Sequence, residues 1–137
     1  MSYLIDTSVV YELARTQPDP RVVEWFKAIP DSALYLSALT LGELRKRAEK
    51  LPDATRREKL RLWLENDLPA WFGDHLLSVD AAVADRWGRL QAEAIRPLSP
   101  VDSLLAATAL HHNLRVVTCN RKDFEIPGLV VVNPWNG

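Results

Sequence analysis

The sequence is poor in the residues that covalent cross-links and soft-metal sites require. Among its 137 residues there are one cysteine, Cys119, and three histidines. A single cysteine cannot form an internal disulfide, and a zinc site would have to rely on histidines and carboxylates. No uncharged run approaches the length of a membrane span, and Asp6 interrupts the first apolar residues where a signal peptide needs an apolar segment. We therefore expect a cytoplasmic protein.

Net charge is also nearly absent, because 17 Lys and Arg residues face 18 Asp and Glu residues. Bulk basicity therefore cannot attract a nucleic acid, and any such affinity must come from local segregation of charge. The hydrophobic fraction of 47% and the charged fraction of 26% are those of a soluble globular protein. A chain of this length can bury a full core, so we expect one domain over residues 1–137.

Five short apolar runs alternate with segments of helical periodicity. The runs are Tyr3–Ile5, Leu34–Leu36, Leu76–Val79, Leu114–Val117 and Leu129–Val132. Such brief, continuous apolar runs are typical of strands that are buried on both faces of a parallel sheet. Helix-capping residues precede the periodic segments, at Asp19, Asp53, Asp80 and Ser99. The alternation predicts an α/β domain with a mostly parallel central sheet of about five strands and helices on both faces.

Four acidic residues stand at junctions between these elements. Asp6 directly follows the first strand, Glu43 comes shortly after the second, Asp102 lies near the start of the last long helix, and Asp123 follows the fourth strand. In a parallel sheet such junctions meet at one edge, where ligands bind. Clustered carboxylates repel one another, and hard cations such as Mg²⁺ or Mn²⁺ suit such a cluster. The pattern predicts a divalent-metal site with the chemistry of a nuclease.

Each acid taken alone also has a structural interpretation. Asp6 could be a helix N-cap, and Thr40-x-x-Glu43 matches a capping box. Asp102 could complement a helix dipole, and Asp123 could be a solvated turn residue. The joint placement of all four favours the metal site.

Four ordered segments resemble the motifs of PIN-domain proteins. They are Leu4–Ser8, Thr40–Arg45, Asp102–Ala109 and Val116–Phe124, and the resemblance extends to the closing Asn133-Pro134-Trp135. The sequence is most similar to the VapC toxins of type II toxin–antitoxin pairs, especially their FitB-like branch. The resemblance implies a Mg²⁺- or Mn²⁺-dependent endoribonuclease that is usually a homodimer. It further implies neutralisation by a cognate antitoxin, through which the toxin enters a larger DNA-bound complex.

The resemblance also assigns individual roles. Asp6, Glu43, Asp102 and Asp123 match the acidic quartet that binds metal and catalyses cleavage in the family. Ser8, Thr118 and Asn120 match its supporting polar positions. One departure is Cys119, which stands where relatives often have Arg and removes a phosphate contact.

A basic run follows Glu43. From Arg45 to Arg61 the chain carries eight cations and three acids. This run fits either a solvated helical face or a surface that binds RNA phosphates, and the sequence leaves both interpretations open. The candidate RNA-binding residues are Arg45, Arg56, Arg57, Lys59 and Arg61. The three histidines lack ligand spacing, and most of the five tryptophans fall on apolar helical faces that predict packing.

Two other functions compete with the nuclease. A haloacid-dehalogenase-like phosphatase would use Asp6 as its nucleophile, but that family needs a second Asp where this chain has Ser8. A non-catalytic PIN-like subunit of a DNA-bound toxin–antitoxin complex would use its acids only to receive Arg or Lys from a partner. Binding of a divalent metal would favour the nuclease, and absence of such binding would favour the non-catalytic subunit.

Overall fold

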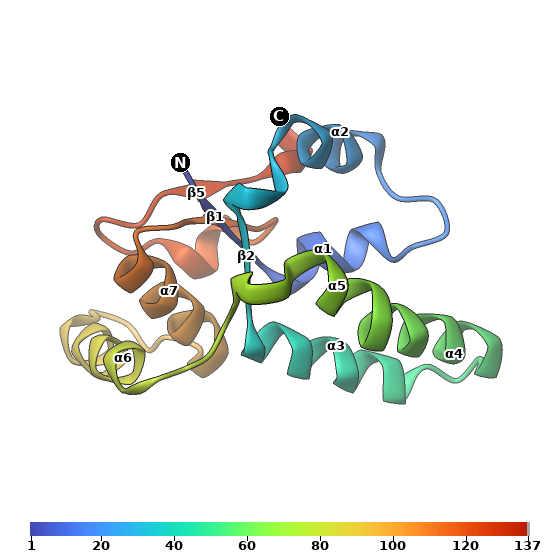
Figure 1. Cartoon of the computed structure of the whole chain (residues 1–137). Coiled ribbons are helices and arrows are strands. Elements are labelled where there is room, and N and C mark those ends of the chain that lie inside the picture. Colours follow the sequence, from blue (N-terminus) through green and yellow to red (C-terminus); the bar gives the residue numbers. More distant parts are fainter. Residues whose placement is uncertain (137) are drawn as a thin grey trace.

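A computed structural model describes residues 1–136 and contains a five-stranded parallel sheet. The strands are β1 (Tyr3–Ile5), β2 (Leu34–Ser37), β3 (Leu76–Leu77), β4 (Arg115–Val117) and β5 (Val131–Val132). Their order across the sheet is β3-β2-β1-β4-β5, so the first strand lies at the centre (Figure 1). The predicted class, the five strands and their parallel direction are confirmed.

Helices connect the strands. They are α1 (Thr7–Leu13), α2 (Pro20–Ala28), α3 (Ala38–Lys50), α4 (Ala54–Leu62), α5 (Leu68–Phe72), α6 (Ala81–Glu93) and α7 (Pro100–His112), with a π-helical segment over Trp63–Asp67 between α4 and α5. The predicted caps Asp19, Asp53 and Asp80 each accept hydrogen bonds from backbone N–H groups of the helix that follows. Ser99 occupies the N-cap of α7, but its side chain makes no capping bond.

The second βα connection differs from the expected capping box. The N-cap of α3 is Ser37, whose Oγ accepts from the backbone N–H of Leu39 at 3.1 Å. The chain passes directly from β2 into α3, so the helix begins earlier than the Thr40-x-x-Glu43 pattern indicates. Thr40 lies inside α3, fully buried, and Glu43 lies in the second turn. Glu43 is therefore not a capping residue.

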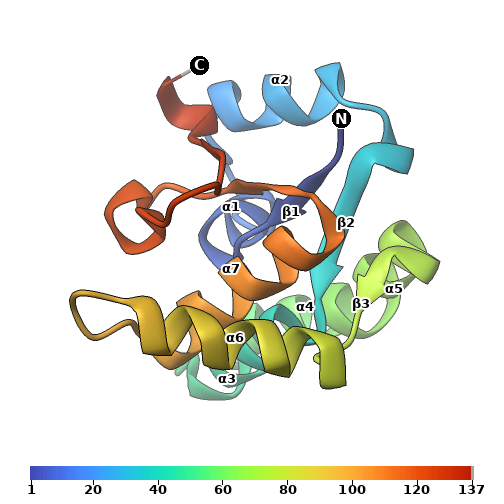
Figure 2. The same ribbon diagram turned by 90° about the vertical axis from the view of Figure 1, so that its left-hand side faces the viewer.

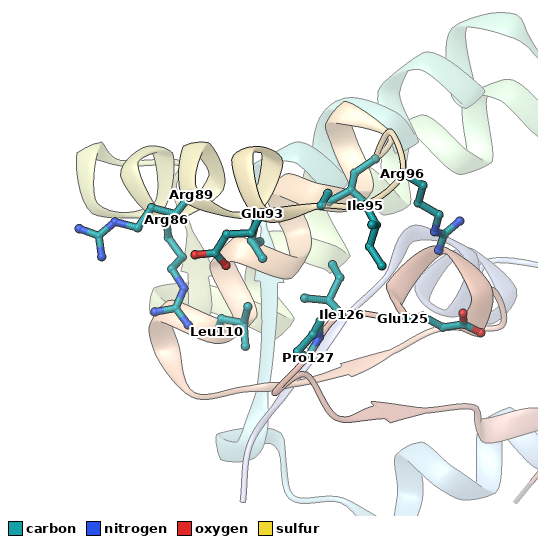
Figure 3. A pocket seen from close by; sticks show the side chains of 12 residues that line it. Arg86, Arg89, Glu93, Ile95, Arg96, Leu110, Glu125, Ile126 and Pro127 are labelled. Atoms are coloured by element: carbon teal, nitrogen blue, oxygen red, sulfur yellow. The ribbon is translucent and has the colours of Figure 1, made fainter.

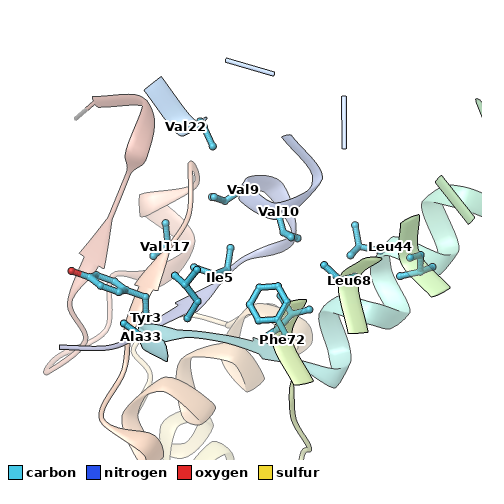
Figure 4. Packing of buried hydrophobic residues seen from close by; sticks show 13 residues of the cluster. Tyr3, Ile5, Val9, Val10, Val22, Ala33, Leu44, Leu68, Phe72 and Val117 are labelled. Carbon is cyan, nitrogen blue, oxygen red and sulfur yellow. The ribbon is translucent and has the colours of Figure 1, made fainter. Parts of the chain in front are cut away.

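Two apolar clusters cover the two faces of the sheet. Alternate residues of β1 point to opposite sides, with Tyr3 and Ile5 in one cluster and Leu4 in the other. The first cluster packs against α1, α2, α3, α5 and the π-helical segment (Figure 4). The second packs mainly against α7 and α6, which lie side by side in Figure 2. This arrangement confirms the prediction of helices on both faces.

The α3–α4 pair extends away from the sheet (Figure 1). The two helices are packed together, and the carboxyl end of β2 feeds directly into α3. One end of α3 therefore lies at the edge of the sheet, and the basic run lies further along the pair. No helix within residues 1–136 is both long and apolar enough to cross a membrane.

Candidate active site

Asp6 sits at the carboxyl end of the central strand. Its backbone N–H donates to the carbonyl of Val117 at 2.9 Å, so the ends of β1 and β4 are tied together. Its carboxylate Oδ2 accepts from the Thr118 hydroxyl at 2.7 Å and from the Ser8 hydroxyl at 3.1 Å. Asp6 occupies the N-cap position of α1, yet its side chain makes no capping bond. The hydroxyls of Thr118 and Ser8 therefore hold the carboxylate at this edge of the sheet.

Burial raises the pKa of Asp6 above its usual range, and the nearby charge of Glu43 raises it further. The hydrogen bonds from Thr118 and Ser8 lower this pKa, but they do not cancel the effect of burial. With 7% of its surface exposed, Asp6 is poorly placed to be solvated. An external positive charge would favour its ionised form.

Glu43 reaches back across the site from α3. Its carboxylate Oε1 accepts from the Thr7 hydroxyl at 2.6 Å, a length usual for a hydroxyl bound to a carboxylate. Thr7 is buried and is the first residue of α1, directly after Asp6. This contact brings the carboxylate of Glu43 to the same sheet edge as Asp6.

Asp102 and Asp123 complete the group. Asp102 is half-buried in the first turn of α7, and Asp123 lies in the short turn Arg121–Phe124 after β4. The pKa of Asp102 is raised to about 6, first by burial and then by the negative charges of Asp6, Asp123 and Glu43. Asp102 therefore lies close enough to the other three acids to feel their charges. We call Asp6, Glu43, Asp102 and Asp123 the acidic cluster.

The acidic cluster suits a hard divalent cation. Within residues 1–136, no Lys or Arg forms an ion pair with any of its members. Its donors are all oxygens, which Mg²⁺ and Mn²⁺ prefer. Over the same residues no three His, Cys, Asp or Glu side chains lie close enough together to hold a metal ion as direct ligands. Mg²⁺ commonly binds through one or two carboxylates and keeps several waters, so this open arrangement fits it.

The predicted supporting residues gather around Asp6. Ser8 and Thr118 donate to its carboxylate, and Thr118 in turn accepts from the backbone N–H of Asn120 at 3.0 Å. Asn120 thus contributes through its backbone, while its side chain is exposed. Cys119 is also exposed beside this group. These contacts join the loop after β4 to the end of β1.

Two of the predicted RNA-binding cations are already paired with acids. Arg45 contacts Glu49 at 3.5 Å and Glu65 at 3.4 Å. Arg61 forms ion pairs with Glu58 and Glu65. These exposed pairs contribute little to stability, but they offset the positive charge of both arginines.

The other three predicted cations differ among themselves. Arg57 donates to the backbone carbonyl of Leu51 at 2.8 Å and so closes the end of α3. Arg56 and Lys59 are exposed and make no ion pair within the part of the chain that the structure describes. Arg57 is only partly exposed and also makes no ion pair within residues 1–136, so Arg56 and Lys59 are the most exposed of the three.

Two further cations lie on the same face of α3 as Glu43. Lys46 and Lys50 follow it by three and seven residues, which is one stripe of a helix. Both are exposed and make no ion pair within residues 1–136. Both belong to the basic run, and their spacing from Glu43 was a signal in the sequence that could have identified them. Thr7 was also missed, and its position directly after Asp6 was its only signal.

The histidines and tryptophans behave as packing or surface residues. His111 and His112 are exposed at the end of α7, and the His75 Nδ1 lies 2.8 Å from the carbonyl oxygen of Leu34. Four of the tryptophans pack against the first apolar cluster, and Trp87 donates to the Ser103 hydroxyl. None of these residues belongs to the acidic cluster.

A separate hollow of about 640 Å³ lies between α6, α7 and the segment around Ile126. Figure 3 shows Arg86, Arg89 and Glu93 of α6 on one side of it and Ile126 and Pro127 on the other. No member of the acidic cluster lines it. This hollow is therefore not the candidate active site, which lies at the acidic cluster.

Comparison with known proteins connects this geometry to a family. The profile of the PIN domain matches residues 3–127. The chain is 35% identical over 136 residues to VapC ribonuclease Y4jK of Sinorhizobium fredii, and the match covers 96% of each chain.

Solved structures agree. The fold matches a chain in the crystal structure of FitAcB from Neisseria gonorrhoeae with a TM-score of 0.92 and 32% identity, over 98% of this chain and 99% of that one. It also matches a chain in a toxin-antitoxin complex from Klebsiella pneumoniae with a TM-score of 0.71 and 28% identity, over 97% of this chain and 98% of that one.

Proposed function

The chain belongs to the PIN-domain family, and from this membership we propose that it is a divalent-metal-dependent endoribonuclease that cuts RNA at the acidic cluster. The observation that carries the proposal is the placement of Asp102 within the electrostatic influence of Asp6, Glu43 and Asp123, with no protein cation paired to any of the four within residues 1–136. For Asp6 and Asp102 this arrangement costs free energy in a protein without a bound cation, because burial and neighbouring negative charges both oppose their ionisation. A metal-binding function explains that cost.

The residues of the acidic cluster would hold Mg²⁺ or Mn²⁺. The bound cation supplies an activated water and stabilises the leaving oxygen of the phosphodiester. Thr118 and Ser8 orient the Asp6 carboxylate, and Thr7 holds one oxygen of Glu43. With a pKa of about 6, Asp102 is mainly ionised at neutral pH and contributes its negative charge to the site.

We further propose that RNA phosphates approach along the α3–α4 pair. Lys46 and Lys50 extend from Glu43 along one face of α3, and Arg56 and Lys59 add unpaired charge on α4. A short track of this kind lets a protein of nearly zero net charge hold a polyanion. Arg45 and Arg61 contribute less, because their charges are matched by Glu49, Glu58 and Glu65.

The partners follow from the same family. A matched chain belongs to a solved toxin-antitoxin complex, and the chain resembles it over nearly its whole length. We propose that this protein is likewise a toxin that forms a homodimer and is neutralised by a protein antitoxin. Loss of RNA cleavage on mixing with the product of a small adjacent gene would support this assignment, and unchanged cleavage would contradict it.

The test of the nuclease function is cleavage of structured RNA with Mg²⁺ or Mn²⁺, with and without a chelator. We expect the chelator to abolish cleavage and Asp102→Asn to lower it by about a hundredfold or more, because the variant loses a charge that stabilises the reaction. Asp85→Asn is the matched control, since Asp85 is exposed on α6 and its one ion pair within the described residues is with Arg89. It should cleave like the wild type.

Three outcomes would contradict the proposal. Cleavage that survives both the chelator and Asp102→Asn would remove the acidic cluster from the reaction. Hydrolysis of a small phosphate monoester without cleavage of RNA would favour the phosphatase. Absence of both activities together with absence of Mn²⁺ binding would favour the non-catalytic subunit.

A further inference from the structure

We propose that Thr7 is a positioning residue, whose hydroxyl holds one oxygen of Glu43 so that the Glu43 carboxylate stays directed into the acidic cluster. The inference rests on the proposed nuclease function and adds a residue to its machinery. We do not expect Thr7 itself to contact the attacking water or the RNA phosphodiester, and it acts through Glu43.

The contact joins two elements that are distant in the chain. Thr7 begins α1 and Glu43 lies 36 positions later in α3, with 2.6 Å between the Thr7 hydroxyl and Oε1. Within residues 1–136 the other oxygen of Glu43, Oε2, accepts no hydrogen bond. One oxygen is therefore fixed by the protein, and the other remains for a cation or its waters.

Thr7 is suited to fix a direction. Only 5% of its surface is exposed, so water does not compete strongly for the hydroxyl. Its β-branched side chain has few accessible rotamers, which limits where the hydroxyl can point. Because Thr7 directly follows Asp6, the backbone that places Asp6 at the sheet edge also places this donor.

Glu43 needs such a restraint because its neighbours repel it. The negative charge of Glu43 raises the pKa of both Asp6 and Asp102, so the three carboxylates interact unfavourably when ionised. Glutamate has a long, flexible side chain, and Glu43 is only partly buried. Without the Thr7 hydroxyl, repulsion would favour conformations of Glu43 that point away from the cluster. The hydrogen bond therefore keeps a ligand in place before the cation binds.

A purely structural role makes a different prediction. If the bond serves only to join α1 to α3, its loss lowers the free energy of unfolding and leaves cation binding unchanged in the folded protein. If Thr7 positions Glu43, its loss weakens cation binding, and the effect disappears once Glu43 has lost its charge. The second prediction is a statement about coupling between two residues.

The experiment is a double-mutant cycle with Thr7→Val, Glu43→Gln and the combined variant. Two quantities are measured: RNA cleavage as a function of Mn²⁺ concentration, and the rise in melting temperature that Mn²⁺ produces. We expect Thr7→Val to weaken Mn²⁺ binding and cleavage by about 10- to 100-fold, the usual effect of removing a group that orients a metal ligand. In the Glu43→Gln background the same change should have no further effect.

Two variants control for the loss of a buried hydroxyl. Thr7→Ser keeps the donor and should restore cleavage to within about threefold of the wild type. Thr108→Val removes another buried hydroxyl, whose one hydrogen bond within residues 1–136 is to the carbonyl of Leu104 in α7, and should leave the Mn²⁺ response unchanged. If Thr7→Val does not fold, Thr7→Ala is measured in the same cycle.

The results separate this inference from the nuclease function. Wild-type cleavage and Mn²⁺ response in Thr7→Val, or a full additional loss in the Glu43→Gln background, would overturn the role of Thr7 alone. A wild-type protein that neither cleaves RNA nor responds to Mn²⁺ would overturn the proposed function and the inference with it.

Discussion

The raised pKa of Asp102 makes the stability of the metal-free protein depend on pH. This pKa is 3.8 for an ordinary aspartate and about 6 in the folded protein, so the folded state binds the proton more tightly between these values. Raising the pH through this window therefore removes stability from the metal-free protein, and Asp102→Asn escapes this loss. We expect the melting temperature of the variant, relative to wild type, to rise between about pH 4 and 7. A constant difference across that range would mean that Asp102 titrates normally.

A second residue that costs stability is Thr40, whose polar side chain is buried outside the acidic cluster. It is fully buried in α3, and its hydroxyl has no hydrogen-bond partner within residues 1–136. Burying an unsatisfied hydroxyl costs about 1–3 kcal/mol, so we expect Thr40→Val to melt at the wild-type temperature or a few degrees above it. Thermal unfolding without metal measures this. A clear loss of stability would show that the hydroxyl is satisfied, for example by an internal water.

On the scale of an element, the α3–α4 pair offers a comparison between paired and unpaired cations. We expect Lys46→Gln with Lys50→Gln to weaken RNA binding and to flatten its salt dependence by about 0.7 per lost contact, the value for single strands. Arg45→Gln with Arg61→Gln removes the same formal charge from residues already paired with acids. This control should change the slope less. Binding titrations at several salt concentrations measure this slope for both double variants. Equal slopes would indicate that the basic run is only a solvated helical face.

The elements themselves were predicted well where local chemistry acts alone. The caps at Asp19, Asp53 and Asp80 are confirmed, because each satisfies nearby backbone groups. Helix α1 was not predicted, since its seven residues are too few to show a period. The capping box at Thr40 was wrong because the end of β2 already supplies Ser37 as a cap. Local patterns cannot show which of two adjacent caps the tertiary structure uses.

On the scale of the whole molecule, the placement of the acids near one edge of the sheet could be expected because parallel topology brings strand ends together. What could not be predicted is which oxygen meets which hydroxyl. The Thr7–Glu43 contact and the neutralisation of Arg45 by Glu65 depend on how α3 sits against α1 and the π-helical segment, and no spacing in the sequence encodes that.

Cation binding should be visible in the stability of the whole fold. A ligand that binds only the folded state at a hundred times its dissociation constant stabilises it by about 2.7 kcal/mol. We therefore expect Mn²⁺ to raise the melting temperature of the wild type by several degrees and a chelator to reverse the rise. Asp6→Asn should lose most of this response. A response of full size in that variant would place the cation elsewhere.

The position of β1 also determines when the candidate active site can form during synthesis of the chain. The strand at the centre of the sheet is made first, yet its neighbour β4 follows more than a hundred residues later, and the bond between Asp6 and Thr118 spans 112 positions. Pairings this distant are slow to form, because the intervening chain must first be ordered. A nascent or prematurely ended chain therefore lacks Thr118 and Asp123, which follow β4. In a refolding reaction we therefore expect RNA cleavage to recover in a single late phase. That phase should coincide with the recovery of native tryptophan fluorescence and should not precede it.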